Sequence, residues 1–233
     1  MTAPLCIAGG LCKQWLEEIG IQIAARIYQI GSVTDDPLDW CAPALNRISA
    51  DFPTVDKEKG KRMQAAIASA KEQGDSLGGV IECFATGLPI GLGEPMFGGV
   101  ESKIAQIVYG IPAVKGVEFG TGFGVSVLFG SQNNDAFFLS DGKVQTKTNN
   151  CGGILGGITN GMPLVFRVAI KPTPSIAMEQ QSISLSKMDA AALTITGRHD
   201  PCIVPRAVPV VEAAAAIAIY DLILGNTQTQ RRK

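Results

Sequence analysis

The sequence has a single histidine, His199, and none of its six cysteines forms a CxxC pair. Zinc centres are built from clustered cysteines and histidines, so no metal site is predicted. Charge of one sign is also scarce, because 20 basic residues face 21 acidic ones. A nucleic-acid-binding protein usually carries a clearly basic face, and this balance argues against that class. Unpaired, scattered cysteines favour a reducing compartment, and we expect a cytoplasmic protein.

The sequence also lacks a long uninterrupted apolar run. Its first residues show no basic region followed by an apolar core and a cleavage site, so no signal peptide is predicted. The most apolar stretch, residues 208–224, is interrupted by Glu212 and Asp221. It is shorter than the roughly 20 apolar residues that a membrane-spanning helix needs. We therefore expect a buried helix and no membrane partner.

Apolar residues are plentiful, at 46%, and their spacing predicts a mixed fold. Helices are expected at residues 2–20, 56–73, 102–109 and 209–225. Strands are expected at residues 21–27, 80–85, 164–170 and 193–196, and in a glycine-punctuated region, 114–147, that includes GFGVSVLFG. The order has no steady βαβ rhythm, so the fold class is α+β. We expect one domain over residues 1–225 and a polar tail over 226–233.

Two glycines interrupt the first predicted helix. Gly9 and Gly10 stand among apolar residues at helical spacing. Glycine costs about 1 kcal/mol relative to alanine inside a helix. Their presence there predicts that another element packs closely against this helix.

Three segments carry residues suited to chemistry, each with a structural alternative. The glycine pairs of Asn149–Gly161 could let backbone N–H groups approach an anion, or could form a tight loop. Lys171–Ile176 sets a lysine and hydroxyls beside two prolines, which suits a phosphate, although the lysine could simply be solvated. Gly197–Cys202 gathers a guanidinium, an imidazole and a carboxylate, which could bind phosphate and move protons or form a structural ion pair.

Six segments together resemble the chorismate synthase family in order and spacing. The segments are GLGEP at 91–95, IPAVKGVEFG at 111–120, GSQNND at 130–135, NNCGGILGGITNG at 149–161, FRVAIKPTPSI at 166–176 and GRHDPCIVPRAVPVVEA at 197–213. The resemblance covers essentially the whole chain. The chain is similar to the C-terminal two-thirds of that family. The N-terminal histidines and arginines expected to serve as acids and to hold the substrate phosphate have no counterpart in it.

The resemblance implies a carbon–oxygen lyase of the shikimate pathway of aromatic amino acid biosynthesis. Its reaction is the anti-1,4-elimination of phosphate from the small-molecule substrate 5-enolpyruvylshikimate 3-phosphate, which gives chorismate. The implied cofactor is reduced FMN. The family is also associated with NADP, but the sequence has no nicotinamide-binding fingerprint. The implied fold is part of a β-α-β sandwich, and the implied assembly is a homotetramer.

The resemblance also assigns site residues. Asp200 corresponds to an acid thought to take part in proton transfer near the flavin. The residues implied to bind the cofactor are Pro112, Ala113, Gly156, Lys171, Pro172, Thr173, Pro174, Ser175 and Arg198. His199 receives no catalytic role.

The chain lacks these N-terminal histidines and arginines, and we expect it to be inactive by itself. Such groups each stabilise the transition state by several kcal/mol. The alternative is a non-catalytic flavin-binding or oligomerising fragment. A stand-alone flavin reductase is a weaker alternative. We further expect exposed apolar surface and poor solubility.

Overall fold

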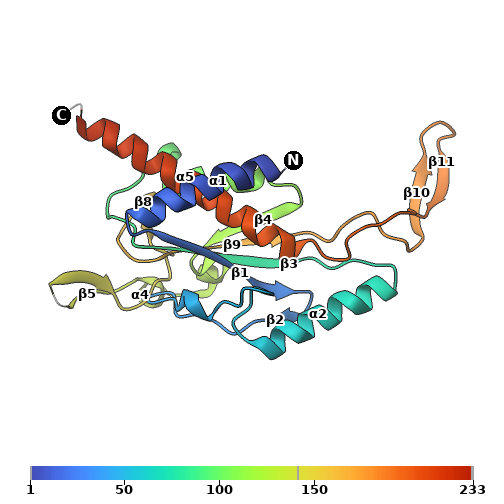
Figure 1. Cartoon of the computed structure of the whole chain (residues 1–233), viewed down its shortest axis with the longest axis horizontal. Helices are drawn as coiled ribbons and strands as arrows, with labels where there is room; N and C mark the ends of the chain where they lie inside the picture. Colours follow the sequence, from blue (N-terminus) through green and yellow to red (C-terminus); the bar gives the residue numbers. More distant parts are fainter. Residues whose placement is uncertain (1, 141, 232–233) are drawn as a thin grey trace.

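The computed structural model describes residues 2–140 and 142–231 and is organised around one five-stranded sheet (Figure 1). The strand order is β2-β1-β3-β9-β4, and each neighbouring pair is antiparallel. The strands are β1 (Gln22–Ile30), β2 (Val33–Thr34), β3 (Gly79–Thr86), β4 (Val114–Phe119) and β9 (Leu164–Ile170). The strands pair antiparallel and the helices are separate from them, which confirms the predicted α+β class.

Helices cover one face of this sheet. α1 (Ala3–Glu18) and α5 (Val204–Arg231) lie side by side on it, and α3 (Val100–Tyr109) packs against α5 (Figure 1). Their apolar residues and those of β1, β3 and β9 form a single main core. A Cβ added to Gly9 would lie 2.4 Å from the Cα of Ala213, so α1 and α5 touch backbone to backbone. The predicted close packing at the first helix is thus confirmed at Gly9.

The opposite face of the sheet carries a row of charges. In the strand register, Arg26, Glu82, Arg167 and Glu118 stand side by side on β1, β3, β9 and β4. Arg26 contacts Glu82 at 2.7 Å and Asp35 at 2.8 Å, and all three side chains are fully buried. Arg167 bridges Glu82 and Glu118 at 2.9 and 3.3 Å. Alternation along each strand explains why one face is apolar and the other is charged.

Shorter elements complete the chain. α2 (Lys57–Glu72) is capped by Asp56, whose carboxylate accepts a hydrogen bond from the Lys59 backbone N–H. The remaining elements are η1 (Leu45–Arg47), η2 (Met96–Gly98), η3 (Gly122–Val127), α4 (Gly130–Asn133), and the hairpins β5 (Phe137–Ser140) with β6 (Lys143–Thr146), β7 (Ile154–Leu155) with β8 (Ile158–Thr159), and β10 (Gln180–Ser184) with β11 (Asp189–Leu193).

Several predicted elements differ from the structure. GFGVSVLFG forms the 3₁₀ helix η3 and not a strand, and its apolar side chains are largely exposed. The strand predicted at residues 193–196 ends at Leu193 as β11, and its partner β10 was missed. The last helix begins at Val204 and includes Pro209, since a proline in the first turns removes few hydrogen bonds. It continues beyond Gly225 to Arg231, and residues 232–233 of the predicted tail lie outside the described residues.

The long C-terminal helix is apolar enough to be tested as a membrane span. Residues Val204–Asn226 pass by length and composition. Most of these residues, including Val211, Ala215 and Ile219, are buried against the sheet and α1. The predicted buried helix is therefore confirmed in this part of the chain.

The outer side of α1 is apolar and open to solvent. Ile7 and Leu11 are four residues apart in α1 and are 68 and 65% exposed. Side chains at such spacing share one face of a helix. This face, together with exposed phenylalanines such as Phe97 and Phe123, gives the chain the apolar surface expected from the sequence.

Candidate functional site

The site arises from antiparallel pairing of β3 with β9. Gly79 at the start of β3 stands opposite Ile170 at the end of β9. The turn that joins α2 to β3 therefore lies beside the segment that follows β9, which begins at Lys171. Strand pairing brings these two distant pieces of sequence to one end of the sheet.

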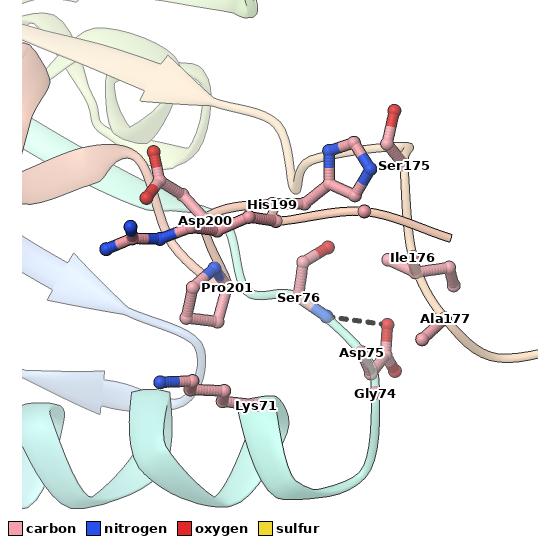
Figure 2. A pocket seen from close by; sticks show the side chains of 12 residues that line it. Lys71, Gly74, Asp75, Ser76, Ser175, Ile176, Ala177, His199, Asp200 and Pro201 are labelled. Atoms are coloured by element: carbon pink, nitrogen blue, oxygen red, sulfur yellow. Dashed lines mark hydrogen bonds between the residues drawn. The ribbon is translucent and has the colours of Figure 1, made fainter. Parts of the chain in front are cut away.

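A pocket of about 410 Å³ lies at this end of the sheet. Figure 2 shows Lys71 on α2 at the bottom and Gly74–Ser76 on the turn that follows this helix. Two further chain segments line the pocket, which we call the first arm (residues 171–178) and the second arm (residues 197–201). The lining residues are Lys71, Gly74, Asp75, Ser76, Ser175, Ile176, Ala177, Gly197, Arg198, His199, Asp200 and Pro201.

Four charged side chains line the pocket: Lys71 and Arg198 are cations, and Asp75 and Asp200 are anions. Lys71 and Arg198 both line it, and neither forms an ion pair with a carboxylate anywhere in residues 2–140 or 142–231. Asp200 does have a partner, because its carboxylate lies 2.5 Å from the Arg206 guanidinium on α5. A guanidinium, an ammonium and the Ser175 hydroxyl are donors that suit a phosphate or another anion. The Ser76 hydroxyl already donates to the Thr173 carbonyl.

Next to the pocket, Cys202 is nearly buried at the start of α5. Burial raises the pKa of the Cys202 thiol. The thiol is therefore neutral near pH 7 and is a poor nucleophile there. The groups suited to binding or proton transfer at this end of the sheet are therefore the charged and hydroxyl side chains.

Three of the residues expected from the sequence meet in this pocket. Ser175 comes from the first arm, and Arg198 and Asp200 come from the second arm. In Figure 2 the His199 ring lies on the side of Ser175, whereas the Asp200 carboxylate points to the opposite side. The structure thus brings together the two polar segments that the sequence analysis treated separately.

Other expected residues lie beside this pocket without lining it. Lys171, Pro172, Thr173 and Pro174 form the start of the first arm. The Lys171 backbone N–H donates to the Ala113 carbonyl at 2.9 Å, which ties the Pro112–Ala113 turn to this arm. Ala113 has φ of +73°, a conformation that side-chain-bearing residues rarely adopt. Such strain often persists at ligand sites.

Gly156 is not part of this cluster. It occupies the turn of the β7–β8 hairpin with φ of +60°, next to Gly157 with φ of +84°. This hairpin precedes β9, whereas Lys171 follows it, and the seven residues of β9 span roughly 20 Å. A Cβ at Gly156 would meet nothing within 4 Å, so the backbone there is open. The expected site residues therefore divide between the two ends of β9.

The sequence analysis missed Lys71, Asp75 and Ser76, which line the same pocket. Residues 56–73 were interpreted as a charged surface helix, and nothing in their local pattern marks a site. Their proximity to Ser175 follows only from the pairing of β3 with β9. Knowledge of that pairing is the signal that would have identified them.

Comparisons with known proteins identify the family of the chain. A family profile described as chorismate synthase matches residues 1–224. A chorismate synthase of Dehalococcoides mccartyi is 47% identical over 224 residues, which are 96% of this chain and 62% of that protein. One from Thermococcus kodakarensis is 45% identical over 225 residues, again 96% of this chain and 62% of the relative.

The fold matches a solved relative as well. A crystal structure of a chorismate synthase superposes with a TM-score of 0.80 at 34% identity, over 97% of this chain and 63% of the other. The chain therefore belongs to the chorismate synthase family. It spans about 62% of the length of the curated relatives that it matches.

Proposed function

We propose that the chain carries one wall of a chorismate synthase active site. In that function a complete site eliminates phosphate from 5-enolpyruvylshikimate 3-phosphate in the presence of reduced FMN and yields chorismate. The observation that carries the proposal is the pocket at the end of β9. There Ser175, Arg198 and Asp200, from two segments of the family pattern, line one cavity with an unpaired cation, Lys71.

The residues at this pocket fit a phosphorylated, polar cofactor such as FMN. Arg198 and Lys71 supply positive charge, and neither forms an ion pair with Asp75 or Asp200, which also line the pocket. The Oγ1 atom of Thr173 is buried and has no hydrogen-bond partner among the described residues. A buried hydroxyl without a partner costs free energy, and a bound polar group would recover it. Pro112 and Ala113, held next to Lys171, would extend this wall.

Gly156 would contact the cofactor from elsewhere. Its open backbone is suited to close approach by a flat ring. It lies beyond the other end of β9, so we propose its contact separately from the pocket at the end of the first arm.

Within this wall, each residue has a distinct task. Arg198 and Lys171 would hold negative charge, and Ser175 would donate a hydrogen bond. Asp200 would accept or hold a proton, with Arg206 fixing the orientation of its carboxylate. Reduced FMN, when bound, supplies electron density to the substrate while phosphate leaves. The prolines at positions 172 and 174 restrict the backbone and keep the first arm in shape.

Turnover tests the proposal directly. The 233 residues contain one histidine and none of the expected N-terminal acids, so by themselves they should convert substrate many orders of magnitude more slowly than a full-length relative. The assay is anaerobic, with reduced FMN, and follows the absorbance of chorismate. The Dehalococcoides mccartyi chorismate synthase is the positive control. A rate near that of the control would refute our assignment of the missing acids and cations.

A second candidate is a non-catalytic flavin-binding or oligomer-forming role. It is favoured by the combination of the anion-suited pocket with the exposed apolar face of α1. Titration with FMN, followed by fluorescence quenching, decides the flavin part. Absence of binding at high micromolar FMN would eliminate every flavin-binding role for these residues.

We further propose a cytoplasmic location and, in a complete enzyme, a homotetramer. Light scattering of the purified chain tests the assembly. A monodisperse tetramer with a sharp cooperative melt would contradict our expectation of poor solubility.

A further inference from the structure

The turn between α2 and β3 contacts both arms of the pocket. The Gly74 carbonyl accepts hydrogen bonds from the backbone N–H groups of Ala177 and Met178, at 2.9 and 3.2 Å. The Leu77 backbone N–H donates to the Pro201 carbonyl at 2.7 Å. The first two bonds reach the first arm and the third reaches the second arm. One short turn therefore fixes two segments that are otherwise separated along the chain by the β10–β11 hairpin.

Ser76 adds a side-chain contact to the same turn. Its hydroxyl donates to the Thr173 carbonyl at 2.7 Å, and only 8% of the residue is exposed. The contact reaches the first arm between Pro172 and Pro174. Prolines have no backbone N–H, so this part of the arm has few ways of its own to bond to the protein.

The first arm depends on this turn more than on any other element. In the described structure, four hydrogen bonds tie residues 171–178 to the rest of the chain: Lys171 to Ala113, Ser76 to Thr173, and both Ala177 and Met178 to Gly74. Three of the four come from the α2–β3 turn. Removing the turn's contacts would leave the arm attached only where β9 ends.

The geometry of the turn allows no easy substitute. Gly74 has φ of +71°, and a Cβ there would lie 3.2 Å from the Cβ of Ala177. A Cβ at Gly78 would lie 2.5 Å from the Ile170 carbonyl and 2.9 Å from Pro172. Backbone and arm are therefore packed against each other, and side chains at either glycine would push the arm away.

From these contacts we infer that Ser76 is a positioning residue for the flavin wall. Through the Thr173 carbonyl it holds the first arm, and through the following Leu77 N–H its turn holds the second arm, so that Ser175 and Arg198 face one ligand. The inference rests on the proposed flavin-binding function, but its structural half, the fastening of the first arm by Ser76, has a readout that needs no ligand.

The test compares Ser76→Ala, Ser76→Thr and Ser126→Ala in the 233-residue chain. Ser126 is the matched control, since its hydroxyl also donates to a carbonyl, that of Phe123 at 2.9 Å, but on the exposed η3 segment. Hydrogen exchange of the ligand-free protein is measured over residues 173–178 and 197–201. FMN affinity is measured by fluorescence quenching, and the melting temperature is recorded for each variant.

We expect the first arm to exchange faster in Ser76→Ala and FMN to bind roughly tenfold more weakly, as loss of one buried hydrogen bond predicts. The second arm keeps its bond from the Leu77 backbone N–H to the Pro201 carbonyl. Ser76→Thr, which retains the hydroxyl, should recover most of the affinity, and Ser126→Ala should change neither measurement. If Ser76→Ala does not fold, Ser76→Cys keeps the size, weakens the donor and is assessed in the same way.

Unchanged exchange in the first arm would overturn the inference, even if FMN affinity fell, because Ser76 would then act by direct contact. Equal FMN affinity of the wild type and Ser76→Ala would overturn it too. Faster exchange in the first arm of a chain that does not bind FMN at all would support the positioning role of Ser76 and refute the proposed flavin-binding function. The two failures are thereby distinguished.

Discussion

The adjacent glycines of α1 should respond to alanine in opposite directions. Gly9 faces α5, and a Cβ there would lie 2.4 Å from both the Cα and the Cβ of Ala213 and 2.6 Å from its carbonyl oxygen. Gly10 is one position along the same helix, and a Cβ there would meet no atom within 4 Å. The two sites share helix, residue type and chemistry, and they differ only in the space beside them.

The magnitudes follow from two opposing effects. Alanine in place of glycine inside a helix stabilises it by about 1 kcal/mol, and Gly10→Ala should gain that amount. Gly9→Ala gains the same helical preference but forces α1 and α5 apart, and overpacking of this kind costs about 1–3 kcal/mol or more. Because the overlap is with backbone atoms that cannot rotate away, we expect a net loss of roughly 2 kcal/mol.

Urea unfolding followed by circular dichroism measures both changes. A difference of about 3 kcal/mol should separate the variants, with melting temperatures on opposite sides of the wild type by several degrees. A Gly9→Ala protein as stable as the wild type would refute the close crossing of α1 and α5. A destabilised Gly10→Ala protein would contradict the open space beside Gly10.

Three other changes test the rest of the structure. Arg26→Met leaves the fully buried Asp35 and Glu82 without their shared cation and should lower the free energy of unfolding by about 3–5 kcal/mol in urea; a loss under 1 kcal/mol would contradict the buried network. The Asp135 carboxylate accepts three hydrogen bonds from residues 148–151, and Asp135→Asn should weaken them. Hydrogen exchange over residues 149–157 should then become faster, and unchanged exchange would argue against this support. Burial raises the pKa of the Cys83 thiol well above its usual value. The folded chain keeps that proton while the unfolded chain loses it above about pH 8.5, so stability should fall as pH rises from there, and a Cys83→Ala variant should lose less.

Much of the fold was predictable because its signals are local. The helix at residues 57–72 begins at the capping Asp56 and shows clear apolar spacing, and β9 shows the apolar run of a buried strand, interrupted only by Arg167. The glycines in α1 were correctly interpreted as a sign of close packing, although only Gly9 is involved in it. These features depend on residues within a few positions of one another.

The wrong predictions involve segments whose partners lie far away or are absent. The η3 segment has the apolar composition of a strand, but no neighbouring strand pairs with it in the described residues, so composition alone misled. Gly225 was interpreted as the end of the last helix, yet glycine only weakens a helix, and α5 continues past it.

The candidate site shows the same division. Ser175, Arg198 and Asp200 were identified from their segments and meet in one pocket. Lys71 and Ser76 were not, because their place beside Ser175 depends on which strand pairs with β3. A pairing between residues about 90 positions apart leaves no trace in either segment by itself.

The row of charges across the sheet bears on how the strands find their alignment. Positive and negative side chains alternate from β1 to β4 through Arg26, Glu82, Arg167 and Glu118. A slip of β3 by one residue would turn Glu82 toward the apolar helices, and a slip by two would set Val80 or Phe84 beside both arginines. Only one alignment neutralises all four charges, so a collapsed chain with misaligned strands is penalised at once. The charges on this face therefore specify the alignment of the strands, in addition to the apolar packing on the other face.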